Sequence, residues 1–322
     1  MIKKRVFVAQ PIAEAGVLIL KKFFSVMVSP RHLSRRELAR SLAFTEALVC
    51  TVNDVIDAAV LEQAPFLGCI SNVAVGFNNI DLSAATRRGI VVTNTPDTLT
   101  DSVAEFVFAH LLAASRRLVE ADNYIRQGKF TRWSLNFFLG GELQGKTLGI
   151  VGLGKIGKAL VPLAHGFGMK ILYTRRTGSE KQYQGGLRTT LQGVLKNADY
   201  VVLLVPLTKE TKHLIARREL FLMKKNAVLV NMARGGIVNE KDLSRALQGG
   251  VIKAACLDVF ENEPAISPEL LKMKNVVLTP HIGSATIEAR KRMALCAAQN
   301  VVDVLLKKSK CKNVVNAGPL RR

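Results

Sequence analysis

Residues 146–160 read KTLGIVGLGKIGKAL, and they indicate the fold of this chain more clearly than any other segment. An apolar run of strand length leads directly into Gly152, Gly154 and Gly157, and a segment with helical spacing follows them. A second apolar run, KILYT at 170–174, comes next. In this strand–turn–helix–strand order, the G-x-G-x-x-G spacing is typical of a dinucleotide-binding turn. The predicted pyrophosphate-binding residues are Gly152, Leu153, Gly154, Lys155, Ile156 and Gly157.

The end of the second strand departs from the usual form of such a site. An acid about 20 residues beyond the glycines normally accepts hydrogen bonds from the adenosine ribose. Here that position is Arg175, with Arg176 and Thr177 beside it. A carboxylate would repel a 2′-phosphate, whereas guanidinium groups can bind it bidentately. The sequence therefore predicts NADP as the cofactor, with NADPH preferred over NADH. The alternative is two solvated arginines in a surface loop.

Outward from this stretch, apolar runs of strand length alternate with helical segments almost throughout the chain. RVFVA, ALVCT, CISNV and IVVTN form one series in the first hundred residues, and a second series starts at residue 146. Long helical segments are expected from Thr98 to about Arg126 and from Ser284 to about Lys308. This alternation predicts an α/β fold of two doubly wound parallel-sheet domains with a cleft between them. The expected substrate-binding domain comprises 1–97 and 285–322, and the Rossmann dinucleotide-binding domain comprises 98–284.

The composition narrows the class of protein. The chain has 322 residues, of which 48% are hydrophobic, and its formal net charge is +21. Such a charge suits nucleic-acid binding, but it also suits a basic surface that steers small anions. The basic residues are spread without a dense block, so we expect neither a nucleic-acid nor a membrane partner. Five cysteines without a CxxC pair favour a reducing, cytoplasmic location and no metal site.

Three loops after later strands carry groups suited to chemistry. NMARGGIVNE supplies Arg234, LDVFENEP supplies Asp258, Glu261 and Glu263, and LTPHIGSAT supplies His281. Singly, each residue also has a structural interpretation, as a salt bridge, a helix cap or a structural hydrogen bond. Together they provide an anion clamp, a carboxylate and an imidazole beside a nicotinamide. That combination is what the reduction of a 2-oxo acid requires.

GLGKIG, NMARGGIV, LDVFENEP and LTPHIGSAT closely resemble the D-isomer-specific 2-hydroxyacid dehydrogenases, and within them most closely the glyoxylate/hydroxypyruvate reductases. The resemblance runs essentially end to end and includes VAVGFNNIDL and TNTPDTLTDSVAEF. It implies NADPH-dependent reduction of a small 2-oxo acid, such as glyoxylate or hydroxypyruvate, to the D-2-hydroxy acid. A 2-ketogluconate-type reductase is one alternative. A non-catalytic, dinucleotide-sensing scaffold like the related corepressors is an alternative from another class.

The resemblance also implies a role for each matching residue. Arg234 binds the substrate carboxylate and polarises its carbonyl, His281 donates the proton, and Glu263 pairs with His281. The backbone of Val75 and Gly76 is implied to bind the substrate carboxylate. Asp258 is implied to bind the nicotinamide carboxamide, and the residues implied to line the nicotinamide are Met232, Ala233 and Gly283. On the adenosine side, the implied contacts are Pro206 and Thr211.

Two departures from the family pattern concern the substrate and the partner. Asn78 stands where an aspartate is common, and the segment 130–143 is a few residues shorter than in close relatives. Trp133 and Phe137 in that segment either shape the substrate pocket or pack in a dimer. A homodimer is expected through the long helix that begins at Thr98. The apolar residues VAEFVFAHLLAA exceed what one helix face needs for its own core.

Overall fold

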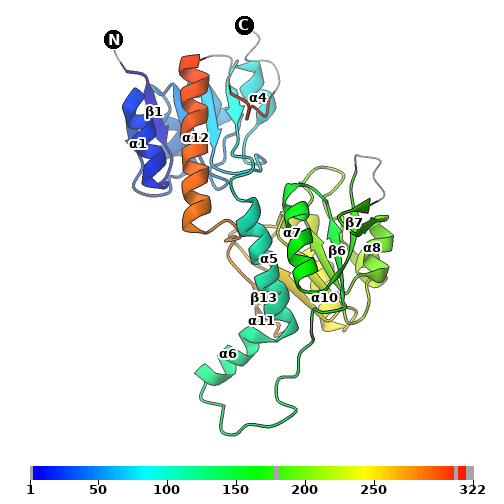
Figure 1. Cartoon of the computed structure of the whole chain (residues 1–322). Helices are drawn as coiled ribbons and strands as arrows, with labels where there is room; N and C mark the ends of the chain where they lie inside the picture. Colours follow the sequence, from blue (N-terminus) through cyan, green and yellow to red (C-terminus); the bar gives the residue numbers. More distant parts are fainter. Residues whose placement is uncertain (1–2, 177–181, 308–310, 317–322) are drawn as a thin grey trace. The chain divides into compact units, whose positions relative to one another are not determined.

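The computed structural model describes residues 3–176, 182–307 and 311–316, in two compact units (Figure 1). The first unit comprises Met1–Leu99 with Ala285–Arg322, and the second comprises Thr100–Ser284. Both are built from parallel strands connected by helices, as the alternating pattern predicts. Among the helices of the described ranges, none combines the length and the apolar character needed to cross a bilayer.

In the first unit, the described residues form a five-stranded sheet in the order β2-β1-β3-β4-β5, and every pairing in it is parallel. Its strands are β1 (Arg5–Val8), β2 (Ser25–Val28), β3 (Ala47–Cys50), β4 (Cys69–Asn72) and β5 (Val91–Thr93). Its helices are α1 (Glu14–Phe23), α2 (Arg35–Ser41), α3 (Ala58–Glu62), α4 (Leu82–Arg87) and α12 (Ile287–Lys307).

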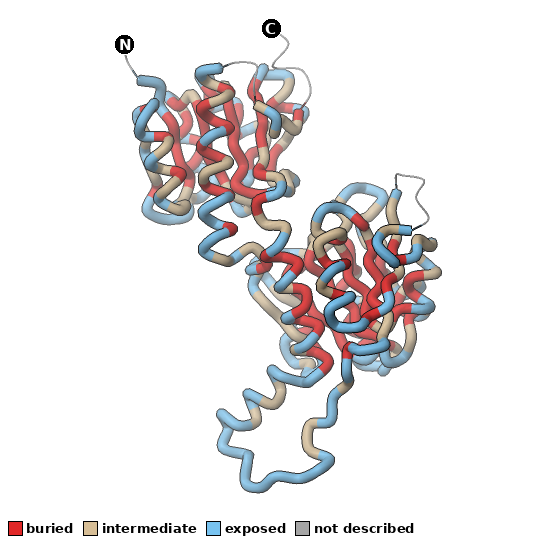
Figure 2. Tube along the Cα trace, in the orientation of Figure 1, coloured by how far each residue is buried: buried red, intermediate tan, exposed pale blue. Residues whose placement is uncertain are grey.

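Alternation along the strands places the core of this unit on both faces of its sheet. Val6 and Val8 of β1 pack with residues of α1 and α12, whereas Phe7 between them packs with residues of α2, α3 and α4. Figure 2 shows the resulting buried strands between partly exposed helices. Because both faces are covered, the strands are mostly apolar, as is typical of parallel sheets.

In the second unit, the described residues form an eight-stranded sheet in the order β13-β12-β11-β10-β6-β7-β9-β8. Only the β8–β9 pairing within it is antiparallel. The strands are β6 (Thr147–Val151), β7 (Lys170–Thr174), β8 (Gln182–Tyr183), β9 (Gly186–Arg188), β10 (Tyr200–Leu203), β11 (Val228–Asn231), β12 (Ala254–Leu257) and β13 (Val276–Leu278).

Helices cover both faces of the second sheet. α8 (Leu191–Asn197), α9 (Arg217–Leu222) and α10 (Glu240–Gln248) enclose one core with side chains of β10 and β11. α5 (Thr100–Ser115) and α7 (Lys155–Gly166) pack on each other and against the strands from the opposite side. The remaining short elements are the 3-10 helix η1 (Gly235–Ile237) and α11 (Pro268–Lys272).

The helix expected from Thr98 to Arg126 is two helices, so this prediction was wrong. α5 ends at Ser115 and α6 covers Leu118–Arg126. Arg117 between them has a φ of 55°, a left-handed conformation that cannot continue an α-helix. The returning chain reinforces the break, because the Gly141 N–H donates a 2.8 Å hydrogen bond to the Ser115 carbonyl.

The break also changes which apolar residues are exposed. Most of the apolar side chains of α5, including Val103, Phe108 and Leu111, are buried within the second unit. By contrast, α6 has no buried residue, and it extends with 127–139 away from the sheet (Figures 1 and 2). The apolar surface attributed to α5 therefore belongs to α6 and the segment that follows it.

Candidate active site

The candidate site lies along one edge of the second sheet. The predicted site residues of this unit follow β6, β7, β10, β11, β12 and β13, which are mutually parallel, so the carboxyl ends of these strands share an edge. The chain passes from β6 to β7 on one side and later to β10 on the other side. Between β6 and β10 the strand order therefore reverses, and doubly wound sheets bind ligands at such a point.

The order of strands also orders the site. Arg175 follows β7 at one end of the edge, the glycine turn follows β6, and Arg234, Asp258 and His281 follow β11, β12 and β13. A ligand laid along this edge would have its adenosine end at β7 and its reactive end at β11–β13. The two groups of residues predicted for opposite ends of a dinucleotide are thus separated in the expected direction.

The glycine turn fits a dinucleotide. Gly152 has a φ of 104°, which favours glycine, and a Cβ on Gly157 would lie 2.7 Å from the Gly152 carbonyl oxygen. A Cβ on Gly154, however, would meet no heavy atom within 4 Å. The first glycine is therefore required by its backbone conformation and the third by close packing. The second leaves an open approach to the backbone. No side chain caps the start of α7, so its first N–H groups face this open side.

His281 and Glu263 form the central pair of the reactive end. The Nδ1 atom of His281 lies 2.8 Å from Oε2 of Glu263, and both side chains are about one-third exposed. The Phe260 N–H donates to the other carboxylate oxygen of Glu263 at 2.9 Å. This pairing directs Nε2, the other ring nitrogen, away from the carboxylate.

Arg234 is held close to the same carboxylate. Burial lowers the pKa of Arg234, and the negative charge of Glu263 opposes this effect. The Asn231 side chain fixes the turn, since it donates to the Arg234 carbonyl at 2.9 Å and accepts from the Ala233 N–H at 3.1 Å. Because a guanidinium stays charged in proteins, Arg234 presents a fixed positive charge at this edge.

Glu263 remains an anion in this setting. Burial is the largest single influence and raises the pKa of Glu263, whereas the hydrogen bonds from His281 and from the Phe260 N–H lower it. The positive charges of His281 and Arg234 act in the same direction, and the net result is a lowered pKa. The site therefore contains a carboxylate, an imidazole that it orients, and a fixed cation.

Asp258 is buried beside this group and organises the loop that carries His281. Its Oδ1 accepts a 2.8 Å hydrogen bond from the Ile282 N–H, and its Oδ2 accepts one of 2.8 Å from the Gly283 N–H. The Thr279 hydroxyl also donates to Oδ1, at 2.7 Å. Of the other predicted residues here, Met232 is buried and Ala233 is half-buried.

At the adenosine end, Arg175 and Arg176 follow β7 directly, and Thr177 lies outside the described residues. Arg175 is half-buried and Arg176 is exposed. The Thr211 hydroxyl donates to the Pro206 carbonyl at 2.6 Å, which closes the loop after β10. This loop carries Glu210, whose pKa is lowered by hydrogen bonding to Thr208 and, to a smaller extent, by the charge of Arg176.

Val75 and Gly76, which the resemblance assigns to substrate binding, lie in the first unit. The Val75 carbonyl accepts a 2.8 Å hydrogen bond from the Asn94 side chain, and the Gly76 carbonyl accepts one of 2.8 Å from the Asn72 side chain. Asn79 in turn accepts from Asn72 at 3.2 Å. The loop is therefore held by side-chain amides, and its role in substrate binding stays a prediction.

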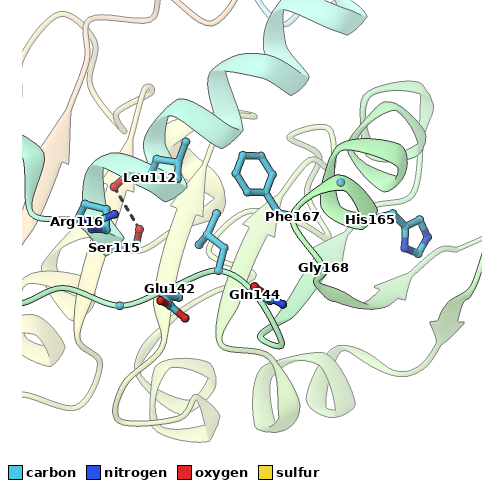
Figure 3. A pocket seen from close by; sticks show the side chains of 11 residues that line it. Leu112, Ser115, Arg116, Glu142, Gln144, His165, Phe167 and Gly168 are labelled. Atoms are coloured by element: carbon cyan, nitrogen blue, oxygen red, sulfur yellow. Dashed lines mark hydrogen bonds between the residues drawn. The ribbon is translucent and has the colours of Figure 1, made fainter.

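A separate pocket of about 510 Å³ lies on the second unit, away from the predicted residues (Figure 3). The C-terminal ends of α5 and α7 and the segment before β6 form it. Its lining residues are Leu112, Ser115, Arg116, Gly141, Glu142, Leu143, Gln144, His165, Gly166, Phe167 and Gly168. It contains no residue of the candidate site.

Sequence reasoning missed several residues that the fold brings to the site. Arg188 of β9 donates a 2.8 Å hydrogen bond to the Arg175 carbonyl, which places a third arginine at the adenosine end. Glu210 lies near Arg176, and His110 of α5 contacts Thr279. The pairing of β9 with β7 and the docking of α5 are long-range features. No local signal in the sequence predicts them.

The chain is similar to known proteins over most of its length. Residues 108–283 match the family described as D-isomer specific 2-hydroxyacid dehydrogenase, NAD binding domain. Glyoxylate reductase from Thermococcus kodakarensis is 47% identical over 309 residues, which cover 93% of this chain and 92% of that protein. Glyoxylate reductase from Pyrococcus furiosus is 48% identical over 309 residues, with the same coverage of 93% and 92%.

A solved structure resembles the whole chain as well. It is that of an NADPH-dependent glyoxylate/hydroxypyruvate reductase from Sinorhizobium meliloti in complex with NADP and malonate. It has a TM-score of 0.89 and 32% sequence identity, and the match covers 99% of each chain. The similarity therefore extends through both units and is not confined to the glycine turn.

Proposed function

The chain belongs to the D-isomer-specific 2-hydroxyacid dehydrogenase family and is an oxidoreductase that reduces a 2-oxo acid, and from this premise we propose that it uses NADPH and that glyoxylate and hydroxypyruvate are its substrates. The observation that carries the proposal is the His281–Glu263 pair, with Arg234 beside it, on the edge that also bears the glycine turn. The names of the relatives support the substrate class.

The residues of the site divide the reaction between them. A bound nicotinamide dinucleotide would supply the hydride. Arg234 binds the substrate carboxylate and draws electron density from the ketone or aldehyde oxygen. His281, oriented through Nδ1 by Glu263, donates a proton from Nε2 to that oxygen as it gains negative charge. The resulting 2-hydroxy acid carries the D configuration expected for the family.

The choice of NADPH rests on the end of β7. Arg175 and Arg176 occupy the position where a ribose-binding acid would repel a 2′-phosphate, and Arg188 adds a further positive charge nearby. Guanidinium groups suit a phosphate, because they donate paired hydrogen bonds in a plane. The NADP bound by the Sinorhizobium meliloti reductase supports the same choice.

A spectrophotometric panel tests the proposed function. The purified chain should oxidise NADPH with glyoxylate and hydroxypyruvate, and it should be slower with larger 2-oxo acids such as 2-ketogluconate. Aldehydes of the same size without a carboxylate should be poor substrates, because they give Arg234 no anion to bind. Equal rates with and without the carboxylate would contradict the role of Arg234. Faster turnover of 2-ketogluconate would support the alternative substrate.

We also propose that the partner of this chain is a second copy of itself. Leu118 and Ile125 of α6, and Trp133, Leu135 and Leu139 after it, are exposed apolar residues within one stretch of chain. The pocket of Figure 3 lies at the base of this stretch, and exposed Leu112 and Phe167 border it. Several large exposed apolar side chains within one segment are typical of a subunit interface.

A further inference from the structure

A buried chain of hydrogen bonds connects α5 to the nicotinamide end of the site. In His110, Nδ1 lies 3.0 Å from the Phe106 carbonyl oxygen and Nε2 lies 3.0 Å from the Thr279 hydroxyl oxygen. The Thr279 hydroxyl lies 2.7 Å from Oδ1 of Asp258. His110 is 2% exposed and Asp258 is 3% exposed. The proposed mechanism uses neither the His110 nor the Thr279 side chain.

Taken as hydrogen bonds, the three contacts of this chain of groups require one hydrogen more than a neutral His110 and an ionised Asp258 leave available. The Phe106 carbonyl and an ionised Asp258 can only accept, so the three contacts along the chain need three hydrogens. A neutral imidazole and one hydroxyl supply only two. Either His110 is an imidazolium, or Asp258 is a neutral acid that donates to Thr279 while Thr279 donates to His110. In both arrangements His110, Thr279 and Asp258 together carry no net charge.

Two opposing influences act on His110. Burial is the largest influence and lowers the pKa of His110, because it disfavours the imidazolium; the Phe106 carbonyl and the Asp258 charge raise it by less, so the net pKa is lowered. These influences decide on which residue the additional proton resides. They do not change the number of hydrogens that the contacts require. The charge of Asp258 is therefore offset wherever the proton lies.

Asp258 is placed to act on the cofactor. Its Oδ1 contacts the Thr279 hydroxyl and accepts from the Ile282 N–H, whereas its Oδ2 accepts only the Gly283 N–H among the described residues. A carboxyl oxygen has two acceptor sites, so Oδ2 can accept one further hydrogen bond, for example from a carboxamide. Ile282 and Gly283 directly follow His281 in the chain, which keeps Asp258 at the reactive end.

We propose that His110, acting through Thr279, offsets the charge of Asp258 and so sets the relative affinity of the site for reduced and oxidised dinucleotide; this rests on the proposed function. Hydride transfer leaves a positive charge on the nicotinamide ring. A bare carboxylate at Asp258 would attract that ring and retain the oxidised product. The neutral set of His110, Thr279 and Asp258 removes this attraction and favours reduction with prompt release of NADP. His110 is thus a positioning residue rather than a catalytic one.

Substitutions on the chain of hydrogen bonds test the proposal by equilibrium binding. His110→Leu fills similar space without an ionisable group, and Thr279→Val replaces the hydroxyl with a methyl group of similar size. Each should lower the ratio of the dissociation constants, NADP over NADPH, on the order of tenfold, the effect of one unit charge ~10 Å away at an effective dielectric of ~20. Thr279→Ser should restore the wild-type ratio. His165→Leu, at an exposed histidine of the same unit, should leave it unchanged.

Adenosine 2′,5′-bisphosphate serves as the probe of folding, because it binds without a nicotinamide. An unchanged ratio in both His110→Leu and Thr279→Val, with this probe bound normally, would overturn the proposal. If His110→Leu no longer binds the probe, Thr279→Val alone tests the proposal.

Proton counting by NMR on labelled His110 and Asp258 gives a separate readout: a neutral His110 beside an ionised Asp258 also overturns the inference. Failure of wild type to bind NADPH or reduce glyoxylate would instead overturn the proposed function, and the proton count would still stand.

Discussion

The Glu263 carboxylate holds the His281 imidazole at Nδ1, so only Nε2 is left to face a substrate carbonyl. His281→Ala removes this proton donor, and we expect kcat to fall at least ~100-fold, the usual contribution of a positioned acid. The dissociation constant for NADPH should change little, because most of the proposed cofactor contacts lie at the glycine turn and at the end of β7. Stopped-flow reduction of glyoxylate, together with NADPH titration, measures both quantities. Near-normal turnover would show that the proton comes from another group.

The lowered pKa of Glu263 makes a prediction about stability and pH. Because the folded-state pKa lies below the ordinary value of 4.5, the carboxylate stabilises the fold at pH values above its unfolded-state pKa. This contribution is lost as the pH falls through the folded-state pKa. The Glu263→Gln variant should therefore be less stable than wild type at about pH 6, and the difference should shrink below pH 4.5. Urea unfolding at a series of pH values measures the difference, and a constant difference across the series contradicts the prediction.

The sequence alone predicts that Arg234, Asp258 and His281 lie close together in the fold. Each follows a strand, and parallel strands end at one edge of the sheet. The same reasoning cannot assign the partner of His281, because Glu261 and Glu263 are two residues apart in one loop. The structure separates them: Glu261 lies 2.5 Å from His213, whereas Glu263 lies 2.8 Å from His281. Only the resemblance to the family favours Glu263 beforehand.

Among the secondary-structure elements, the ends of β7 and β10 would surround the 2′-phosphate of the proposed NADPH. Arg175→Asp removes one guanidinium and adds repulsion, so activity with NADPH should fall and activity with NADH should rise. Two charged hydrogen bonds at the low end of their usual strength correspond to a preference on the order of a hundred-fold. Salt should reduce this preference, because Arg176 is exposed. The ratio of kcat/KM for NADPH and NADH, measured at low and high salt, tests both statements.

Removing the negative charge of Glu210, near Arg176, should have the opposite effect on cofactor preference from Arg175→Asp. The Glu210 charge lies close enough to Arg176 for the two to interact, and it would repel a bound 2′-phosphate. Glu210→Gln should therefore raise the preference for NADPH over NADH by a few-fold, the effect of one exposed charge. Equal kcat/KM for the two cofactors in wild type, with no change in this variant, would leave the arginines as solvated surface groups.

Close approach of two loops provides a prediction about packing between elements. A Cβ on Gly235 would lie 1.8 Å from the Phe260 carbonyl carbon and 2.4 Å from the Glu261 nitrogen. These are backbone atoms, so Gly235→Ala must separate the loops after β11 and β12, at a cost of roughly 3 kcal/mol or more. Gly236→Ala is the control, because its nearest neighbour is a Leu207 methyl at 3.4 Å. Equal unfolding midpoints in urea for the two variants would contradict this account.

The sequence predicts the central strands well, because each is a long apolar run between turn residues. It does not predict β8 and β9, which have two and three residues and are specified by pairing with each other and with β7. The break between α5 and α6 is missed for a related reason. Helical periodicity continues across Arg117, and the left-handed conformation there depends on the returning segment near Gly141.

At the scale of the whole molecule, the two-series pattern of strands predicts two sheets, and α12 returns the chain to the first of them. The net charge of +21 is spread over both units and identifies no single surface. Composition alone also assigns the exposed apolar surface to α5, which is wrong. It cannot distinguish a helix that is buried in its own unit from one that is exposed. Burial of α5 and exposure of α6 resolve that point.

The exposed apolar stretch then determines the expected assembly. Trp133 is 71% exposed and Leu135 is 77% exposed. The rest of their own unit therefore leaves most of both side chains uncovered. If a second copy covers them, the double variant Trp133→Gln with Leu135→Gln should weaken the dimer at least ~100-fold, as expected for two interface anchors. Light scattering at micromolar concentration should then give the mass of a monomer. Leu271→Gln changes a leucine of α11 that is 60% exposed outside this stretch, and it should leave the dimer intact. A monomeric wild type, or an unchanged mass in the double variant, would show that α6 and the segment after it serve some purpose other than pairing two copies of the chain.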